Sequence, residues 1–247
     1  MSSFTFITTF AKRHDFGYNL VKSFDEFVSK DMDLIVYGDP DMQDDFDDYE
    51  NVRFSLLDRV PIQRFIENGA VEKQKSKGII SQKNSDDFLY DAIRFCFKSY
   101  CQIQHSNQCK TQYMVWVDSD VEFTRTVTED DLNGLIDNDY YLSYLHRETR
   151  YTETGWIIFN THHPYHKVFF NQFAKLYDTY GIFSLKHWTD CHAFDHCRKL
   201  SEKEGVKHKR LTPKNLLSMH GDHAWKASPL NDFSIHWKGP RDNHIKL

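Results

Sequence analysis

The fold is decided by one stretch near the middle of the chain, Tyr113-Met114-Val115-Trp116-Val117-Asp118-Ser119-Asp120. Its first five residues are apolar without alternation, a pattern typical of a strand that is buried on both faces. The strand ends at two carboxylates that are separated by one small residue. The stretch therefore predicts the central strand of a largely parallel sheet, with helices covering both sides.

The segments around this stretch alternate between strand and helix patterns. Before it, residues 4–10 and 33–38 read as strands, and residues 16–30 have the apolar spacing of a helix. We also expect strands at 52–57, 139–145, 155–160 and 233–237, helices at 86–104, 164–179 and 188–203, a solvated acidic turn at 41–50 and a surface loop at 67–85. The alternation predicts one α/β domain over residues 1–247, with a mostly parallel mixed sheet and helices on both faces.

The composition excludes several classes of protein. The chain has 247 residues, and its 31 Lys and Arg against 36 Asp and Glu give a net charge of −5. Such an acidic chain lacks the positive charge of a general nucleic-acid binder, so we expect no nucleic-acid partner. Its 20 Phe, 13 Tyr and 5 Trp supply a core and exclude disorder as the main state.

The cellular setting is inferred from cysteines and from apolar segments. Five Cys without a C-x-x-C pair do not form the pattern of a disulfide framework, which favours a reducing compartment. No signal peptide and no apolar window of about 20 residues is visible, so we expect no transmembrane segment. The predicted location is the cytoplasm, or the host cytoplasm if the protein is viral.

Asp118 and Asp120 follow the central strand at the place where α/β sheets bind ligands. That place lies beyond the carboxyl ends of the strands. Two hard oxygen donors there suit Mg²⁺ or Mn²⁺, which keep coordination positions open for substrate phosphates. The alternative is an Asp-rich turn that caps the next element. We favour the metal site.

This strand and its D-x-D sequence resemble the nucleotide-sugar glycosyltransferases of the GT-A fold. Residues 6–10 are similar to the family's opening strand, whose end holds the nucleobase, and residues 153–160 to the segment lining the acceptor side. Residues 235–240 are similar to the ending of glycogenin-like enzymes, in which a His ligates the metal. Small viral and bacterial members, including chlorovirus enzymes, are of comparable size. The chain departs from glycogenin after Gly239, where the Lys-Pro-Trp of that ending is missing.

The resemblance implies a GT-A-like fold and a metal-dependent hexosyl- or pentosyltransferase of glycan biosynthesis. The enzyme would move a sugar from a nucleoside-diphosphate sugar, with a UDP-sugar favoured, to a hydroxyl of a glycan or glycoconjugate. Asp118, Asp120 and His236 would hold Mn²⁺ or Mg²⁺, which neutralises the charge that develops on the leaving diphosphate. For His236 the alternative is a buried, hydrogen-bonded histidine.

The resemblance also assigns residues to the nucleotide sugar. Three of them, Asp91, Arg94 and Lys98, have the spacing i, i+3, i+7 and are predicted to share one helix face. Asp91 and Arg94 are preferred over Lys98, and the alternative is a solvated charged stripe. The full predicted set is Thr8, Thr9, Asp91, Arg94, Lys98, Asp118, Ser119 and Lys238.

Asp190 is the predicted catalytic base, and Glu153 is the second candidate. A carboxylate near the acceptor hydroxyl would remove its proton in an inverting transfer. The alternative for the segment is helix capping by Thr189 or Asp190. A retaining transfer needs no such base, because the departing phosphate takes the proton. The stereochemistry, the sugar, the acceptor and the oligomeric state stay open.

Two other functions stay open as well. A sugar-1-phosphate nucleotidyltransferase also holds Mg²⁺ with Asp residues, but it usually has a Gly-rich loop after the first strand, where residues 11–17 contain one glycine. A glycan- or nucleotide-binding module would use the same residues without turnover. Trp156, Trp188 and Trp225 could stack on a sugar ring, although core packing is the expectation for each alone.

Overall fold

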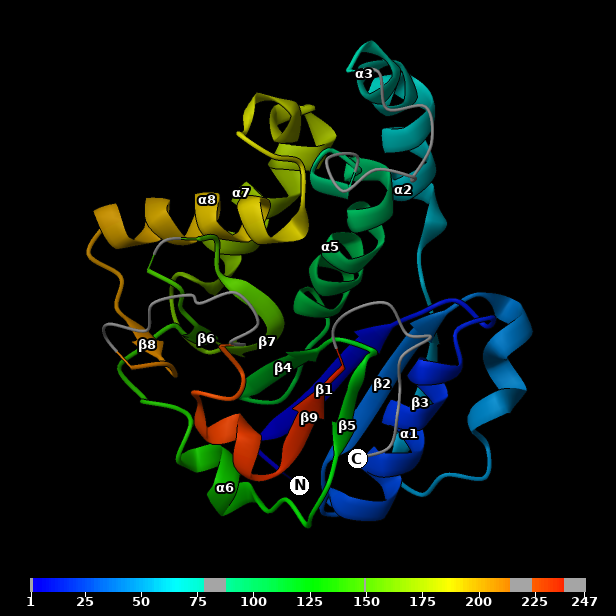
Figure 1. Ribbon diagram of the computed structural model, residues 1–247, viewed down its shortest axis with the longest axis vertical. Helices are drawn as coiled ribbons and strands as arrows, with labels where there is room; N and C mark the ends of the chain where they lie inside the picture. The colour runs from blue at the N-terminus through cyan, green and yellow to red at the C-terminus, as the bar shows by residue number, and fades with distance from the viewer. Residues whose placement is uncertain (1, 78–87, 149, 214–223, 238–247) are drawn as a thin grey trace.

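The computed structural model describes residues 2–77, 88–148, 150–213 and 224–237. A seven-stranded sheet forms its centre, in the order β3-β2-β1-β4-β7-β6-β8 (Figure 1). Along the sheet these strands are Val52–Leu56, Asp33–Gly38, Phe4–Thr9, Tyr113–Val117, Glu153–Asn160, Leu142–Leu145 and His208–Arg210. Strand β7 is antiparallel to both its neighbours, and all other pairs are parallel. The predicted α/β class with a mostly parallel mixed sheet is confirmed.

The two faces of the sheet carry different layers, as Figure 1 shows. One layer contains α2 (Arg59–Phe65), α5 (Ala92–Ser106), α7 (His166–Asp178) and α8 (Asp190–Lys203). The opposite layer contains α1 (Asp15–Phe27), α6 (Glu129–Asn133) and a ribbon of β5 (Val121–Phe123) and β9 (Ser234–His236). Among the described residues, no helix is both long and apolar enough to cross a membrane.

Strand β4 lies between the two layers, and all five of its residues are buried. Met114 and Trp116 pack in the core under α5, α7 and α8. Tyr113, Val115 and Val117 pack in the core that contains α1 and the ribbon. Successive side chains of a strand point to opposite faces, so the unbroken apolar run fills both cores at once.

Three local predictions need correction. The predicted loop at 67–85 is wrong for 67–76, which form η2 (Ile66–Ala70) and α3 (Val71–Ser76), while 78–87 lie outside the described residues. The acidic segment forms the 3₁₀ helix η1 (Pro40–Phe46), because Met42 and Phe46 are buried in the core. The helix expected at 86–104 begins at Ala92 and ends at Ser106.

Candidate active site

The three predicted metal ligands lie where β4 meets the ribbon. The Asp118 N–H donates to the Gly155 carbonyl at 2.8 Å, which extends the pairing of β4 with β7 by one residue. The chain then turns, with the Val121 N–H donating to the Asp118 carbonyl at 3.1 Å. Strand β5 follows and pairs Val121 with His236 on β9. The turn and the ribbon thus bring His236 beside two carboxylates that are more than a hundred residues away in sequence.

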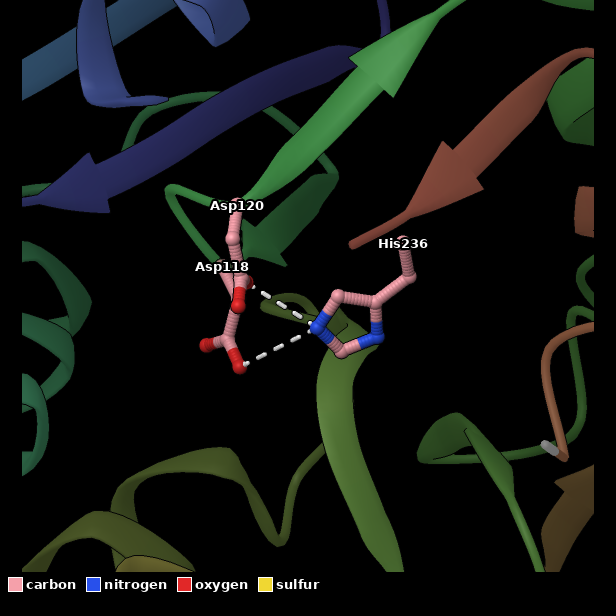
Figure 2. A group of neighbouring side chains, drawn as sticks. All are labelled: Asp118, Asp120 and His236. Atoms are coloured by element: carbon pink, nitrogen blue, oxygen red, sulfur yellow. Dashed lines mark hydrogen bonds and ion pairs between the residues drawn. The ribbon is translucent and has the colours of Figure 1, made fainter. Parts of the chain in front are cut away.

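The donor atoms of these residues converge, as Figure 2 shows. The His236 Nε2 lies 3.0 Å from Oδ1 of Asp120 and 4.0 Å from Oδ2 of Asp118. One ligand atom from each residue lies within 4.8 Å of the others. The imidazole has no exposed side-chain surface, whereas the Asp118 and Asp120 side chains are 26% and 18% exposed. Two carboxylate oxygens and an imidazole nitrogen could together hold a metal ion.

Gly155 allows the His236 ring to take this position. A Cβ on Gly155 would lie 2.5 Å from Cε1 of His236 and 2.9 Å from its Nδ1. Real Cβ atoms essentially never approach so closely, so any other residue would push the ring away. On another side the ring packs against Trp225, with ring centroids 4.8 Å apart. The backbone of β7 and the Trp225 indole therefore orient the imidazole.

Lys98 on α5 links this cluster to Asp190 at the start of α8. Its Nζ lies 2.6 Å from Oδ1 of Asp118 and 2.8 Å from Oδ2 of Asp190. It also donates to the Thr154 carbonyl at 2.8 Å and lies 3.3 Å from the Thr154 hydroxyl oxygen. The Thr154 hydroxyl donates to the same Asp190 oxygen at 2.6 Å. Asp118, a predicted metal ligand, and Asp190, the predicted base, thus share the Lys98 ammonium.

The charged groups of this site shift one another's pKa values. Asp118 and Asp190 share the Lys98 ammonium, and Asp120 lies beside His236. Burial raises the pKa of Asp118, and the negative charges of Asp120 and Asp190 raise it further. The Lys98 ammonium lowers this pKa, but by less than the other effects raise it. Burial would lower the pKa of Lys98, but Asp118 and Asp190 together raise it, so the ammonium stays charged.

The two predicted bases are both buried carboxylates with charged partners. Burial would raise the pKa of Asp190, but Lys98 and the Thr154 hydroxyl hold it below its ordinary value, which makes Asp190 a weak proton acceptor. Thr189, not Asp190, caps α8 through its hydroxyl. The Glu153 Oε2 lies 3.6 Å from the Arg147 guanidinium, and its Oε1 accepts from the Gly155 N–H at 3.2 Å. Their catalytic roles stay predictions.

The three residues predicted to share one face of α5 have different surroundings. Asp91 precedes the helix as its N-cap and accepts from the Arg94 N–H at 3.0 Å. The Arg94 side chain is exposed and lies over the Phe88 ring. Of the three, Lys98 is the residue that reaches Asp118, and the nucleotide roles of all three stay predictions.

The remaining predicted nucleotide contacts lie on β1 and in the turn after β4. Thr8 is fully buried, and its hydroxyl has no hydrogen-bond partner among the described residues. The Thr9 hydroxyl donates to the Tyr37 carbonyl at 2.7 Å on the neighbouring strand. Ser119 is half-buried between the two carboxylates, and Lys238 lies outside the described residues. For these four residues the nucleotide role stays a prediction.

Three side chains at the site were not predicted as site residues: Trp116, Arg147 and Thr154. The Trp116 Nε1 donates to Oδ1 of Asp118 at 2.7 Å. Its spacing of two residues from Asp118 on a strand was a usable signal, because such residues share a face. Arg147 and Thr154 gave no such signal, since their partners come from other elements.

The three tryptophans considered for sugar stacking are core residues. Trp156 and Trp225 pack in the core beside the ribbon, and Trp188 in the core under α8; each is at most 3% exposed. A sugar ring needs an accessible aromatic face to stack on, so the stacking alternative is wrong for this conformation.

Comparison with solved structures finds glycosyltransferases. The chain is similar to mouse xyloside xylosyltransferase 1 in its apo form, with a TM-score of 0.51 and 9% identity over 85% of each chain. It is also similar to the apo bifunctional glycosyltransferase WbbM (TM-score 0.49, 11% identity, 79% of this chain and 37% of that one) and to apo GlyE of Streptococcus pneumoniae TIGR4 (0.49, 8%, 84% and 45%). No protein-family model and no curated protein matches the chain.

We rest the fold assignment on the xylosyltransferase, which the chain covers nearly throughout. At 9% identity this likeness shows the fold alone. The chain has a GT-A-like glycosyltransferase fold, and the resemblance read from the D-x-D strand is confirmed at that level.

Proposed function

We propose that the chain is a metal-dependent glycosyltransferase that moves a sugar from a nucleoside-diphosphate sugar to a hydroxyl of a glycan. One observation carries the proposal: Asp118, Asp120 and His236 converge at the carboxyl end of the central strand of a GT-A-like sheet. This edge of the sheet is where α/β folds bind their ligands. We take Mn²⁺ or Mg²⁺ as the cation, because two of the three donors are carboxylates, and a UDP-sugar as the favoured donor.

Three residues would hold the cation, and Lys98 would support them. The cation supplies positive charge for the diphosphate as the bond to the sugar breaks. Asp118, Asp120 and His236 would hold the cation, and His236 would offer Nε2, the ring nitrogen that faces both carboxylates. Lys98 would orient Asp118 and Asp190 and oppose their protonation, because its ammonium contacts both.

The acceptor hydroxyl would attack the anomeric carbon while the nucleoside diphosphate leaves. In an inverting transfer Asp190 or Glu153 would take the hydroxyl proton. The lowered pKa of Asp190 favours the other route, in which the leaving phosphate takes it. The proposed nucleotide-sugar contacts are Thr8, Thr9, Asp91, Arg94, Lys98, Asp118, Ser119 and Lys238.

A thermal-shift panel tests the donor and the cation together. Wild type, Asp120→Asn and Asp33→Asn are melted with and without Mn²⁺, each with UDP, GDP, CDP or ADP. A ligand of the native state adds about 2.7 kcal/mol of stability at a hundredfold excess over its Kd. We expect UDP to raise Tm only with Mn²⁺ and only in wild type and Asp33→Asn. Asp33 is the matched control, because it is an exposed carboxylate paired with Arg53 outside the site.

Product analysis then separates the remaining functions. A glycosyltransferase incubated with Mn²⁺ and a panel of UDP-sugars releases UDP. The release is slow when water accepts the sugar and faster when a suitable glycan accepts it. Release of UTP from a UDP-sugar and diphosphate would instead indicate a nucleotidyltransferase. Binding of UDP without release from any donor would indicate a binding module. Failure of all four nucleotides to bind would overturn the proposal.

A further inference from the structure

The two oxygens of Asp118 face different partners. The Trp116 Nε1–H donates to Oδ1 at 2.7 Å, and the Lys98 ammonium lies 2.6 Å from the same oxygen. Oδ2 is the oxygen that lies on the side of His236, 4.0 Å from its Nε2. One oxygen is therefore saturated by donors of the protein, and the other faces the ligand cluster.

Trp116 contacts both members of this ion pair. The edge of its indole donates to Asp118, while the Lys98 Nζ lies 5.1 Å from the centroid of its ring, within the range of a cation–π contact. The indole is 1% exposed and packs in the core under α5, α7 and α8. Because it is rigidly packed, its N–H has a fixed direction, which a flexible surface donor would not have.

We propose that Trp116 is a positioning residue for the metal site. Its hydrogen bond to Oδ1 of Asp118 would leave only Oδ2 of that carboxylate to ligate the metal. The inference rests on the proposed metal-dependent function. An unrestrained carboxylate binds a cation through one oxygen or through both. A ligand limited to one oxygen leaves an additional coordination position for the diphosphate. Partners that orient metal ligands typically change metal affinity about 10–100-fold when they are removed.

Trp156 provides a matched control. It is fully buried on β7, next to β4, and faces the opposite core. Its Nε1 has no hydrogen-bond partner among the described residues. Trp116→Phe and Trp156→Phe therefore delete the same atoms from a buried strand, but only the first removes a hydrogen bond to a proposed ligand.

The test is a titration of each purified chain with Mn²⁺ alone, with free Mn²⁺ followed by electron paramagnetic resonance. We expect Trp116→Phe to raise the Kd about 10–100-fold and Trp156→Phe to leave it unchanged. Both variants should lower Tm in the presence of a chelator, since each leaves a small cavity. Equal Kd values for Trp116→Phe and wild type would overturn the inference and leave the metal site intact. A wild-type chain that binds no Mn²⁺ would overturn both the inference and the proposed function.

A second measurement avoids the variant and covers the case in which Trp116→Phe does not fold. In the wild-type chain with ¹⁵N-labelled tryptophan, Mg²⁺ should move the indole N–H resonance of Trp116, because a cation on Oδ2 withdraws charge from Oδ1. The Trp156 resonance should move less. A Trp116 resonance that stays in place while Mg²⁺ binds would contradict the proposed hydrogen bond to a ligand.

Discussion

Lys98 is the residue on which the charges of the site depend. Its ammonium contacts two carboxylates: Asp190, which is buried, and Asp118, which is 26% exposed. Removing one member of such a buried pair strands the other charge, which is usually strongly destabilising. Helical spacing identified Lys98 as a neighbour of Asp91 and Arg94 but could not show that Lys98 reaches Asp118. The contact with Asp118 is a tertiary property of one residue.

Gly155→Ala should weaken the proposed metal site. The new Cβ would clash with the His236 ring at 2.5 Å, so the imidazole must move away from Asp120. We expect the Kd for Mn²⁺ to rise about tenfold or more, by loss of ligand orientation. The measurement is a Mn²⁺ titration of the purified variant.

Gly181→Ala is the control for this substitution. A Cβ there would lie 3.4 Å from the Leu176 side chain, an ordinary contact at the edge of the tight range, and remote from the ligands. Its Kd should equal that of wild type. If Gly155→Ala also bound Mn²⁺ as wild type does, His236 would not be a ligand in the orientation described.

At the scale of elements, α5 is the helix that connects the core to the site. Its first turn is held by side chains: Asp91 caps it, and the Gln74 side chain of α3 accepts from the Ile93 N–H at 2.8 Å. Gln74 also donates to Asp91 at 3.4 Å. The start of α5 therefore sets the height at which Lys98 meets Asp118, about two turns along the helix.

Asp91→Ala should destabilise the protein by about 1 kcal/mol, within the usual range for loss of an N-cap. Asp91→Asn should keep most of that stability, because the amide oxygen also accepts from the Arg94 N–H. Urea denaturation of both variants measures the difference.

The same pair of variants separates capping from nucleotide binding. If Asp91 only caps α5, Asp91→Asn should bind UDP with Mn²⁺ as wild type does. A loss of UDP binding in a stable Asp91→Asn chain would support the predicted nucleotide contact. Equal stability of Asp91→Ala and wild type would contradict the capping role.

At the scale of the whole molecule, three largely buried histidines couple folding to pH. Burial lowers the pKa of His105, His166 and His208 to about 4 each. The His105 Nδ1 is hydrogen-bonded to the Tyr37 hydroxyl at 2.9 Å, and the His208 Nε2 to the Ser201 hydroxyl at 2.7 Å. His105 lies on α5, His166 begins α7 and His208 begins β8, so none of the three is on the elements that carry the proposed metal ligands.

We expect the stability to fall between about pH 6.5 and pH 4. A histidine whose folded pKa is lowered binds its proton more readily in the unfolded chain. The contribution of such a histidine to the free energy of unfolding is therefore complete above its pKa in the unfolded chain. It is lost as the pH falls toward the pKa in the folded chain. Each such group adds a slope of up to about 1.4 kcal/mol per pH unit. Urea denaturation at a series of pH values measures the slope.

Two variants check the origin of this slope. His105→Gln should be less stable at neutral pH, but its stability should fall less steeply below pH 6.5. His162→Gln changes an exposed histidine and should alter the profile far less than His105→Gln, because His162 adds only a smaller charge effect to the burial that lowers the pKa of His166. A stability that is flat from pH 7 to pH 4.5 would contradict the neutral, buried state of these histidines.

The sequence by itself determined the central strand, the class of the sheet and the place of the site. The apolar run before Asp118 fills two cores, and that burial pattern is a local property of consecutive residues. A strand that ends in carboxylates places them at the ligand-binding edge of the sheet. His236 came from the resemblance of the chain's ending, and the structure places its ring beside Asp118 and Asp120.

Only the tertiary structure decided which side chains surround these ligands. Lys98, Asp190 and Thr154 come from α5, α8 and β7, and they meet because β7 inserts antiparallel beside β4 while both helices cover the same face. Local sequence patterns specify neither the order of strands in a sheet nor how far a helix is shifted along its axis over that sheet. Those depend on the packing of residues far apart in sequence, and for that reason the partners of Asp118 could not be predicted although Asp118 itself could.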